Sequence, residues 1–257
     1  MGFRCGIIGL PNVGKSTIFN ALTAAGAEVA NYPFCTINPN IGIVPVPDQR
    51  LEHIAKIIHP PKFTYTTMEF VDIAGLVKGA SKGEGLGNRF LGNIRDVDAI
   101  VHVVRCFNDP NVAHVHGAVS PTGDIDVVNM ELILADLETV EKRIEKVEKS
   151  AKAGDKSHRD ELQLYYTIRE ALGKNQPVRN VALSTDNEII LKDLNLITAK
   201  KVLYIANVGE SELKEKEGYI AAVEELAKAD GSEAIIICGD MEAEIATLPE
   251  SDRRDFL

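Results

Sequence analysis

A glycine-rich loop near the N-terminus carries the residues best suited to phosphate chemistry. The run from Gly9 to Thr17, Gly-Leu-Pro-Asn-Val-Gly-Lys-Ser-Thr, matches the pattern G-x-x-x-x-G-K-[ST] at every fixed position. Its glycines let the backbone curl so that successive N–H groups face phosphate oxygens. Lys15 is placed to reach the β- and γ-phosphates of a nucleotide, and the Ser16 hydroxyl to bind Mg²⁺. The residues expected to contact the nucleotide here are Asn12, Val13, Gly14, Lys15, Ser16 and Thr17.

A second motif, Asp72-Ile73-Ala74-Gly75, follows the β-prone run 66–71. Ligands bind at the carboxyl ends of strands in open α/β sheets, so Asp72 is predicted to hold Mg²⁺ through water. The Gly75 N–H is predicted to face the γ-phosphate. The glycines of 75–92 predict a segment that is not helical throughout. It would order around the γ-phosphate, or be an ordinary flexible surface loop.

The elements that must position these motifs alternate between strand and helix. The phosphate loop stands between a predicted strand at 4–8 and a predicted helix at 16–24. The other predicted strands are 41–46, 66–71, 99–106, 202–206 and 234–238, and the other predicted helices include 48–58, capped by Asp48, and 219–228. This alternation predicts an α/β fold with a mainly parallel sheet, a P-loop NTPase of the Ras-like G-domain type.

One connection is too long for this pattern. The step from Cys106 to Val202 is about three times a β-α-β step, which indicates an insertion. Within it, an a/d seam predicts a coiled-coil helix, and a second apolar stripe predicts its antiparallel partner. The seam is Ile133, Leu137, Val140, Ile144, Val147 and Ala151, and the stripe is Leu164, Ile168 and Leu172. We therefore expect a nucleotide domain at 1–125 and 199–257, interrupted by a helical domain at 126–198.

Composition limits the classes of function. The chain has 257 residues, 45% of them hydrophobic, and a net charge of −10, so bulk charge does not favour nucleic acid and no DNA binding is expected. The cysteines are scattered, which indicates reduced thiols in a cytoplasmic protein. No signal peptide or membrane span is expected. Residues 142–159 carry seven basic and three acidic side chains. They form either a patch for RNA or an acidic protein face, or a solvated helix face.

The sequence resembles the translation-factor-related GTPases and, more closely, the YchF / Obg-like ATPase family. The resemblance rests on Gly9–Thr17, Asn31–Asn40, Val71–Gly87, Ile205–Glu210 and the position of the predicted coiled coil. It implies a cytoplasmic, monomeric ATPase that acts as a switch on the ribosome. A binding module with incidental turnover and a GTPase of the same fold are the alternatives. Family members carry a TGS domain after the nucleotide domain, which is not seen up to Leu257, so expectations about partners that depend on it are weaker.

The run Asn-Val-Gly-Glu at 207–210 bears on base choice. GTPases of this fold carry N-K-x-D there, with the aspartate paired to guanine and the lysine stem packed on the ring. Here Val208 replaces the lysine and Glu210 the aspartate, while Asn207 could pair with adenine N6 and N7. Because unpaired groups are penalised, we expect ATP over GTP, as the resemblance also implies. A guanine pocket with a conservative change is the alternative.

Catalysis must differ from that of Ras, because Leu76 stands where Ras-type proteins have a water-orienting glutamine. By resemblance, His114 is the candidate for this role, with Lys15 and Gly75 completing the catalytic set. An ordinary loop histidine is the alternative, and His116 lies two residues further on. The resemblance also assigns Thr36 to Mg²⁺ together with Ser16 and Asp72, and Asn12 to a K⁺ ion. Hydrolysis is expected to be slow without a partner.

Overall fold

A six-stranded sheet forms the centre of the molecule. The computed structural model describes residues 2–27, 41–73, 75, 86–114, 117–151, 156–214, 218–249 and 252–253. The strands are β1 (Phe3–Ile8), β2 (Ile41–Val46), β3 (Thr66–Asp72), β4 (Ala99–Arg105), β5 (Lys201–Asn207) and β6 (Glu233–Ile237). Their order is β2-β3-β1-β4-β5-β6, and only β2 runs antiparallel to its neighbour. The prediction of a mainly parallel sheet is confirmed.

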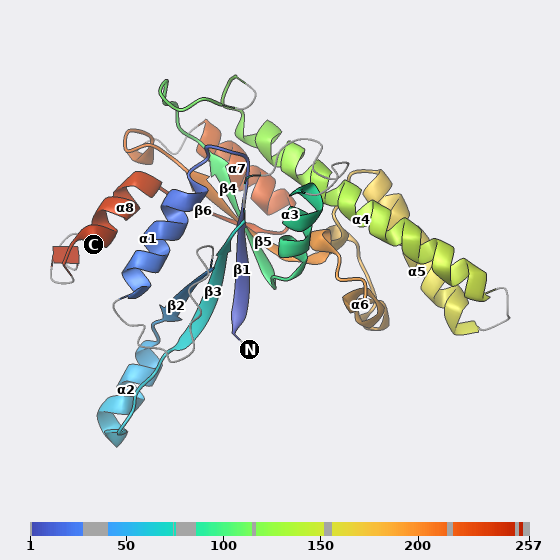
Figure 1. The fold of residues 1–257 in the computed structure, drawn as a ribbon, viewed down its shortest axis with the longest axis horizontal. Helices are drawn as coiled ribbons and strands as arrows, with labels where there is room; N and C mark the ends of the chain where they lie inside the picture. Colours follow the sequence, from blue (N-terminus) through green and yellow to red (C-terminus); the bar gives the residue numbers. More distant parts are fainter. Residues whose placement is uncertain are drawn as a thin grey trace.

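Helices cover both faces of this sheet (Figure 1). Their bounds are α1 (Lys15–Ala27), α2 (Gln49–Ile58), α3 (Leu86–Arg95), α4 (Pro121–Ala151), α5 (Lys156–Gly173), α6 (Thr185–Lys192), α7 (Tyr219–Ala229) and α8 (Gly239–Thr247). In β5, Ile205 lies in one core cluster with Ile18 of α1, whereas Ala206 lies in another with Val223 of α7. Consecutive strand residues point to opposite faces, so α1 and α7 lie on opposite sides. Helix α8 packs beside α1.

Helix α4 belongs to two bodies. Its first half packs on the sheet through Val128 and Leu132, and its second half packs on α5 through Val140 and Ile144. Figure 1 shows α4 and α5 running side by side away from the sheet. The antiparallel helical insertion predicted from the heptad spacing is thus confirmed. The predicted domain boundary at residue 126 falls inside this single 31-residue helix, which is continuous from the sheet to the hairpin.

A buried carboxylate joins the two bodies near the middle of α4. Asp136, which is 0% exposed, accepts hydrogen bonds from the backbone N–H groups of Ile197 and Thr198 and from the Thr198 hydroxyl. Arg95 of α3 lies 3.7 Å from the same carboxylate. Burial raises the pKa of Asp136, while these hydrogen bonds and Arg95 act in the opposite direction. The insert therefore returns to the sheet at a fixed point.

Helix α2 lies apart from the main body, at the outer end of the β2–β3 pair (Figure 1). As predicted, Asp48 caps it, accepting from the Arg50 N–H at 2.9 Å. The predicted apolar face is present, but no residue of α2 is buried. Of the glycine-rich stretch, residues 86–95 form α3, while 76–85 lie outside the described part of the chain. Cys5, Cys106 and Cys238 are buried free thiols, and Cys35 also lies outside the described residues.

Candidate functional site

The phosphate loop connects β1 to α1 at the carboxyl edge of the sheet. The first helical turn is closed by the Ile18 N–H, which donates to the Gly14 carbonyl at 3.0 Å. Three loop residues have positive φ angles, Gly9 at 149°, Asn12 at 60° and Gly14 at 92°. Asparagine tolerates the left-handed region, whereas the Gly14 position has a second requirement. A Cβ atom there would clash with Asn207 Nδ2, so glycine is needed for both conformation and space.

Lys15 lies inside this loop. Its ammonium donates to the Leu10 carbonyl at 2.6 Å, and the residue is only 7% exposed. Burial lowers the pKa of Lys15 to about 8, and the nearby Asp72 carboxylate opposes that change. Gly75 lies against the same loop, since a Cβ atom on it would be 3.2 Å from Lys15 Nζ and 3.0 Å from the Pro11 nitrogen. The structure thus brings the two sequence motifs together.

Ser16 and Asp72 form the second part of the site. Parallel pairing places Asp72, at the end of β3, beside Ile7 of β1, next to the start of the loop. The Ser16 hydroxyl donates to Asp72 Oδ2 at 2.8 Å. Asp72 Oδ1 is buried and has no hydrogen-bond partner among the described residues. Mg²⁺ prefers oxygen ligands and retains several waters, so this hydroxyl and unpaired carboxylate oxygen fit it. Thr36, the third predicted ligand, lies outside the described residues.

Asn207 connects the loop to the end of the sheet. Its Nδ2 donates to the Val13 carbonyl at 2.8 Å, and its Oδ1 accepts from the Gly239 N–H at 2.9 Å. The residue is 5% exposed, so the first function of its side chain is to hold the phosphate loop against α8. An amide has two donor hydrogens and two acceptor lone pairs, so one of each remains after these contacts. The pairing of Asn207 with adenine stays a prediction.

The structure places the side chain of Val208, while its predicted contact with the nucleotide stays a prediction. Its side chain is 2% exposed and packs with Val104, Ile220 and Val223, and its N–H donates to the Ile237 carbonyl at 2.9 Å. It therefore points into the core beneath α7 and offers no side-chain surface to a base. Side chains alternate between the two faces of a strand, and Val208 continues this alternation just beyond β5. It therefore lies on the same face as Ala206, in the same core cluster. Glu210 is exposed on the following turn, and its role in base choice stays a prediction.

Phe107, which the sequence reasoning missed, lies beside the same turn. Its Cβ is 3.7 Å from where a side chain on Gly209 would begin. The Arg105 guanidinium lies 4.6 Å from the centre of its ring. Arg105 is 2% exposed and donates to the carbonyls of Phe107, Asp109 and Val112, which shapes the loop after β4. The sequence signal that could have indicated Phe107 is an arginine at the end of an apolar strand with an aromatic residue shortly after it.

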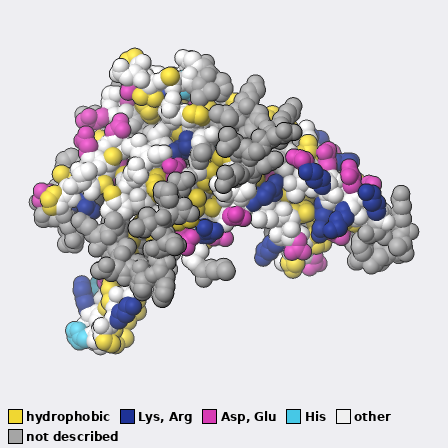
Figure 2. All heavy atoms as spheres, viewed as in Figure 1, with side chains coloured by type: hydrophobic (Ala, Val, Ile, Leu, Met, Phe, Trp, Pro, Cys, Tyr) yellow, Lys and Arg dark blue, Asp and Glu magenta, His cyan; other side chains and the backbone are white. Residues whose placement is uncertain are grey.

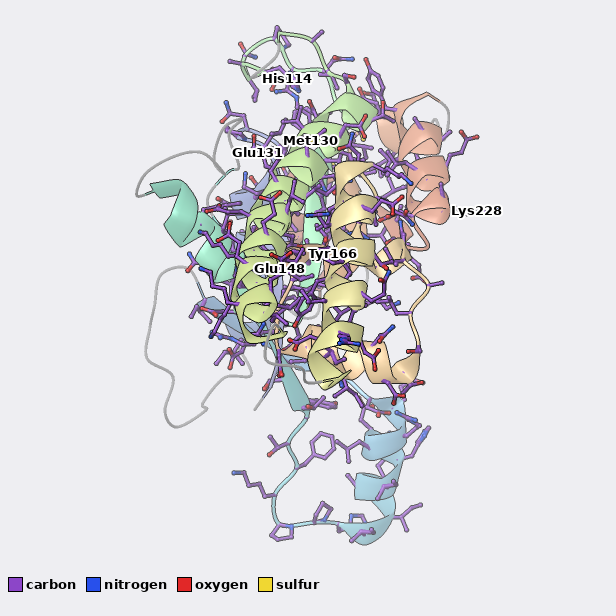
Figure 3. All side chains as sticks on the ribbon, turned by 90° about the vertical axis from the view of Figure 1, so that its right-hand side faces the viewer. His114, Met130, Glu131, Glu148, Tyr166 and Lys228 are labelled. Carbon is purple, nitrogen blue, oxygen red and sulfur yellow. The ribbon has the colours of Figure 1, made fainter. Side chains whose placement is uncertain are left out.

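His114 ends this loop, close to the phosphate loop. Asn12 Nδ2 donates to the carbonyl of Ala113 at 3.2 Å, and a K⁺ ion at Asn12 stays a prediction. His114 Nε2 lies 2.9 Å from Asp124 Oδ2 in the first turn of α4, and both side chains are 5% exposed. Figure 3 shows His114 on the loop that enters α4, at the far end of the hairpin from Glu148 and Tyr166. The imidazole contacts α4, and its catalytic role stays a prediction.

Comparison with known proteins places this site in a family. A family model described as 50S ribosome-binding GTPase matches residues 4–134. The ribosome-binding ATPase YchF of Haemophilus ducreyi is 52% identical over 257 residues, covering all of this chain and 70% of the relative. The chain belongs to the YchF family. The Bacillus subtilis relative of the same name is 51% identical over 259 residues, covering 100% of this chain and 71% of the relative.

A solved structure supports the same membership. The Schizosaccharomyces pombe YchF GTPase has a TM-score of 0.87 and 35% sequence identity, covering 99% of this YchF-family chain and 70% of that protein. The fold is therefore that of a P-loop G domain with a helical insertion. The relatives' names differ on the base, ATPase for the two bacterial proteins and GTPase for the yeast one. Among the described residues, no helix is long and apolar enough to cross a membrane.

Proposed function

We propose that this chain is a Mg²⁺-dependent ATPase that hydrolyses ATP to ADP and phosphate and acts as a nucleotide-dependent switch on the ribosome. The observation that supports hydrolysis most directly is the convergence of Lys15, Ser16, Asp72 and Gly75 at one edge of the sheet. The bacterial relatives named ribosome-binding ATPases support both the reaction and the partner. A cytoplasmic monomer with no DNA or membrane partner completes the proposal.

Each residue has a defined task at the phosphates. Lys15 exchanges its contact with the Leu10 carbonyl for oxygens of the β- and γ-phosphates, which are stronger partners because they are charged. The Gly75 N–H, beside Lys15, donates to the γ-phosphate. Ser16 would hold Mg²⁺ directly and Asp72 through water. When bound, the ion would neutralise charge on the transferred phosphoryl group.

Base choice is proposed to follow from the environment of the Asn207–Glu210 turn. The remaining N–H and lone pair of the Asn207 amide match adenine N7 and N6. With Val208 in the core, no side chain replaces the lysine stem that packs on guanine in related GTPases. GTP is the second candidate, because the yeast relative is named a GTPase. Glu210→Asp, which restores the shorter carboxylate, should move preference toward GTP if the proposal is right.

The attacking water is proposed to be oriented by His114 after its ring leaves Asp124. The pairing at 2.9 Å with low exposure favours slow hydrolysis, because the imidazole is held by α4 in the free protein. A K⁺ ion at Asn12 Oδ1 would add positive charge near the phosphates. His114→Ala should lower turnover while leaving nucleotide affinity unchanged. Parent-rate hydrolysis by this variant would remove His114 from the mechanism.

The coiled coil is the proposed route from nucleotide to ribosome. Lysine and arginine side chains lie over α4 and α5 (Figure 2), although Lys142 pairs with Glu138 and Arg143 with Glu161. These pairs also fit a solvated helix face, the other interpretation of this region. A binding module with incidental turnover predicts ribosome affinity that ignores the nucleotide. A switch predicts different affinities with ATP and with ADP.

The proposed reaction is tested by phosphate release from labelled ATP with and without Mg²⁺. Lys15→Ala should abolish productive binding and turnover, because it removes the buried ammonium proposed to contact the β- and γ-phosphates. Lys228→Ala, on the exposed surface of α7, is the matched control and should behave as the parent. Turnover retained by Lys15→Ala would refute the site.

A further inference from the structure

Helix α2 displays a continuous apolar face to solvent. The exposed fractions of Ile54, Ile57 and Ile58 are 51%, 79% and 68%, and Phe63 in the returning segment is 40% exposed. Figure 2 shows these hydrophobic side chains at the end of the protruding arm, next to lysine, arginine and histidine. Isolated exposed apolar residues are common, whereas a contiguous group on one element marks an interaction site.

This arm is built as a rigid element. Asp48 caps the first turn of α2, and His59 closes the last turn in the left-handed conformation, with its N–H donating to the Ala55 carbonyl. The Tyr65 hydroxyl donates to Glu52 at 2.6 Å, and its ring packs edge-on against Phe63, with centroids 4.8 Å apart. The return segment is thereby fixed to the helix. A preformed helix loses little conformational entropy on binding, which favours docking.

The exposed face contains a hollow. A cavity of about 480 Å³ lies between α2 and the returning segment. Its lining is Leu51, Ile54, Ala55, Ile58, Pro60, Lys62, Phe63 and Thr64. Such a hollow accepts a projecting apolar side chain from a partner, as interface hot spots do. A lipid surface presents no such projection, so a protein fits this shape better than a membrane.

The charges around the hollow indicate the sign of the partner. Both acidic residues of the arm are engaged internally, Asp48 by Arg50 at 2.8 Å and Glu52 by Tyr65. Lys56 and Lys62 have no ion-pair partner in the part of the chain that the structure describes. Residues 48–65 of the arm carry three basic and two acidic side chains, a net charge of +1 in a chain of net charge −10. A second copy would bring like charges together, and the isoleucines at the centre of the face offer RNA no hydrogen-bond partner.

We propose that the apolar face of α2 docks an acidic protein surface of the ribosome, with apolar side chains of that surface entering the hollow. The inference rests on the proposed ribosome function and names a partner class for it. It also separates two surfaces, a protein contact at α2 and the helical hairpin beyond the other side of the sheet (Figure 1).

Co-sedimentation with purified 70S ribosomes and a non-hydrolysable ATP analogue tests this docking. Ile57→Asp puts a charge beside the hollow on the same exposed face as Ile54 and Ile58, and should weaken binding by about tenfold or more. The matched control is Ile189→Asp, which makes the same change at a 60% exposed isoleucine of α6 and should bind as the parent. Binding of Ile57→Asp at the parent affinity, or an equal loss in both variants, would overturn the inference. Failure of the parent chain to bind would instead overturn the proposed function.

Photocrosslinking identifies the occupant. With p-benzoylphenylalanine in place of Ile57, irradiation on 70S ribosomes should give a product that resists ribonuclease and contains an acidic peptide. A product that ribonuclease destroys would assign the face to RNA, and a crosslinked dimer would assign it to a second copy. Flotation of the parent, but not of Ile57→Asp, with phosphatidylglycerol vesicles would assign it to lipid. Each of these three results would contradict the proposal.

Discussion

Raising the pH should weaken nucleotide binding, because Lys15 loses its proton in the free protein. The ammonium is buried in the phosphate loop and donates to the neutral Leu10 carbonyl, and burial lowers the pKa of Lys15 to about 8. Phosphate oxygens would supply negative charge within contact distance and raise that pKa again, since nearby opposite charge favours the ionised form. Nucleotide binding should therefore take up protons, and affinity should fall as pH rises through 8.

The size of the effect follows from the lowered pKa. In the free protein, Lys15 is about half deprotonated at pH 8 and about nine-tenths deprotonated at pH 9. Binding should thus take up about 0.5 and about 0.9 protons at these two pH values. The protonated fraction falls roughly tenfold between pH 7 and pH 9, which weakens binding by about 1.4 kcal/mol. Because the bound state holds more protons than the free state, nucleotide affinity must fall as the pH rises.

Titration calorimetry of Mg²⁺-ADP in buffers of different ionisation enthalpy measures this uptake directly. The slope of observed enthalpy against buffer ionisation enthalpy gives the protons taken up. Lys15→Arg is the control, because a guanidinium stays charged across this range and should take up none. A slope near zero for the parent chain at pH 9, with binding intact, would refute the placement of Lys15 at the phosphates or its lowered pKa.

Three substitutions test the framework around the site. Gly14→Ala should cost about 1–3 kcal/mol in urea unfolding and weaken nucleotide binding, because φ is 92° and a Cβ meets Asn207; unchanged stability would contradict the close approach. Asp136→Ala should cost about 3–5 kcal/mol in the same assay, since it leaves the Thr198 donors buried and unpaired. A cost under 1 kcal/mol would show that the hydrogen bonds to Asp136 are dispensable for stability. Val208→Lys should lower the melting temperature by burying an ammonium in the core. A fully stable variant with gained GTP affinity would contradict the burial of this side chain.

Much of the scaffold was predictable because its signals are local. The phosphate-loop pattern predicted a strand before it and a helix after it, and β1 and α1 flank the loop as expected. The heptad spacing of Ile133, Val140 and Ile144 predicted a seam that is now seen buried against α5. Asp48 at the start of α2 was a capping residue by type and is one in the structure. These features depend on residues close in sequence, so periodicity and residue type suffice.

Features that depend on distant contacts were not predictable. The antiparallel direction of β2 and the order of the strands arise from pairing across the sheet. The burial of the Val208 side chain depends on α7, which covers that face of the sheet and lies far from it in sequence. The partner of His114 was likewise hidden, because Asp124 becomes its neighbour only when α4 starts beside the loop. The apolar stripe of α2 predicted a helix, but it could not show whether that face is buried or exposed to solvent.

The ATP-dependent account is tested most directly by titrating ATP and GTP onto this chain, with Mg²⁺ and K⁺ present. Calorimetry on the parent and on Glu210→Asp gives both affinities and the effect of the carboxylate. The account predicts tighter binding of ATP by the parent and a shift toward GTP in the variant. Equal or tighter binding of GTP by the parent would contradict it and identify the protein as a conventional GTPase.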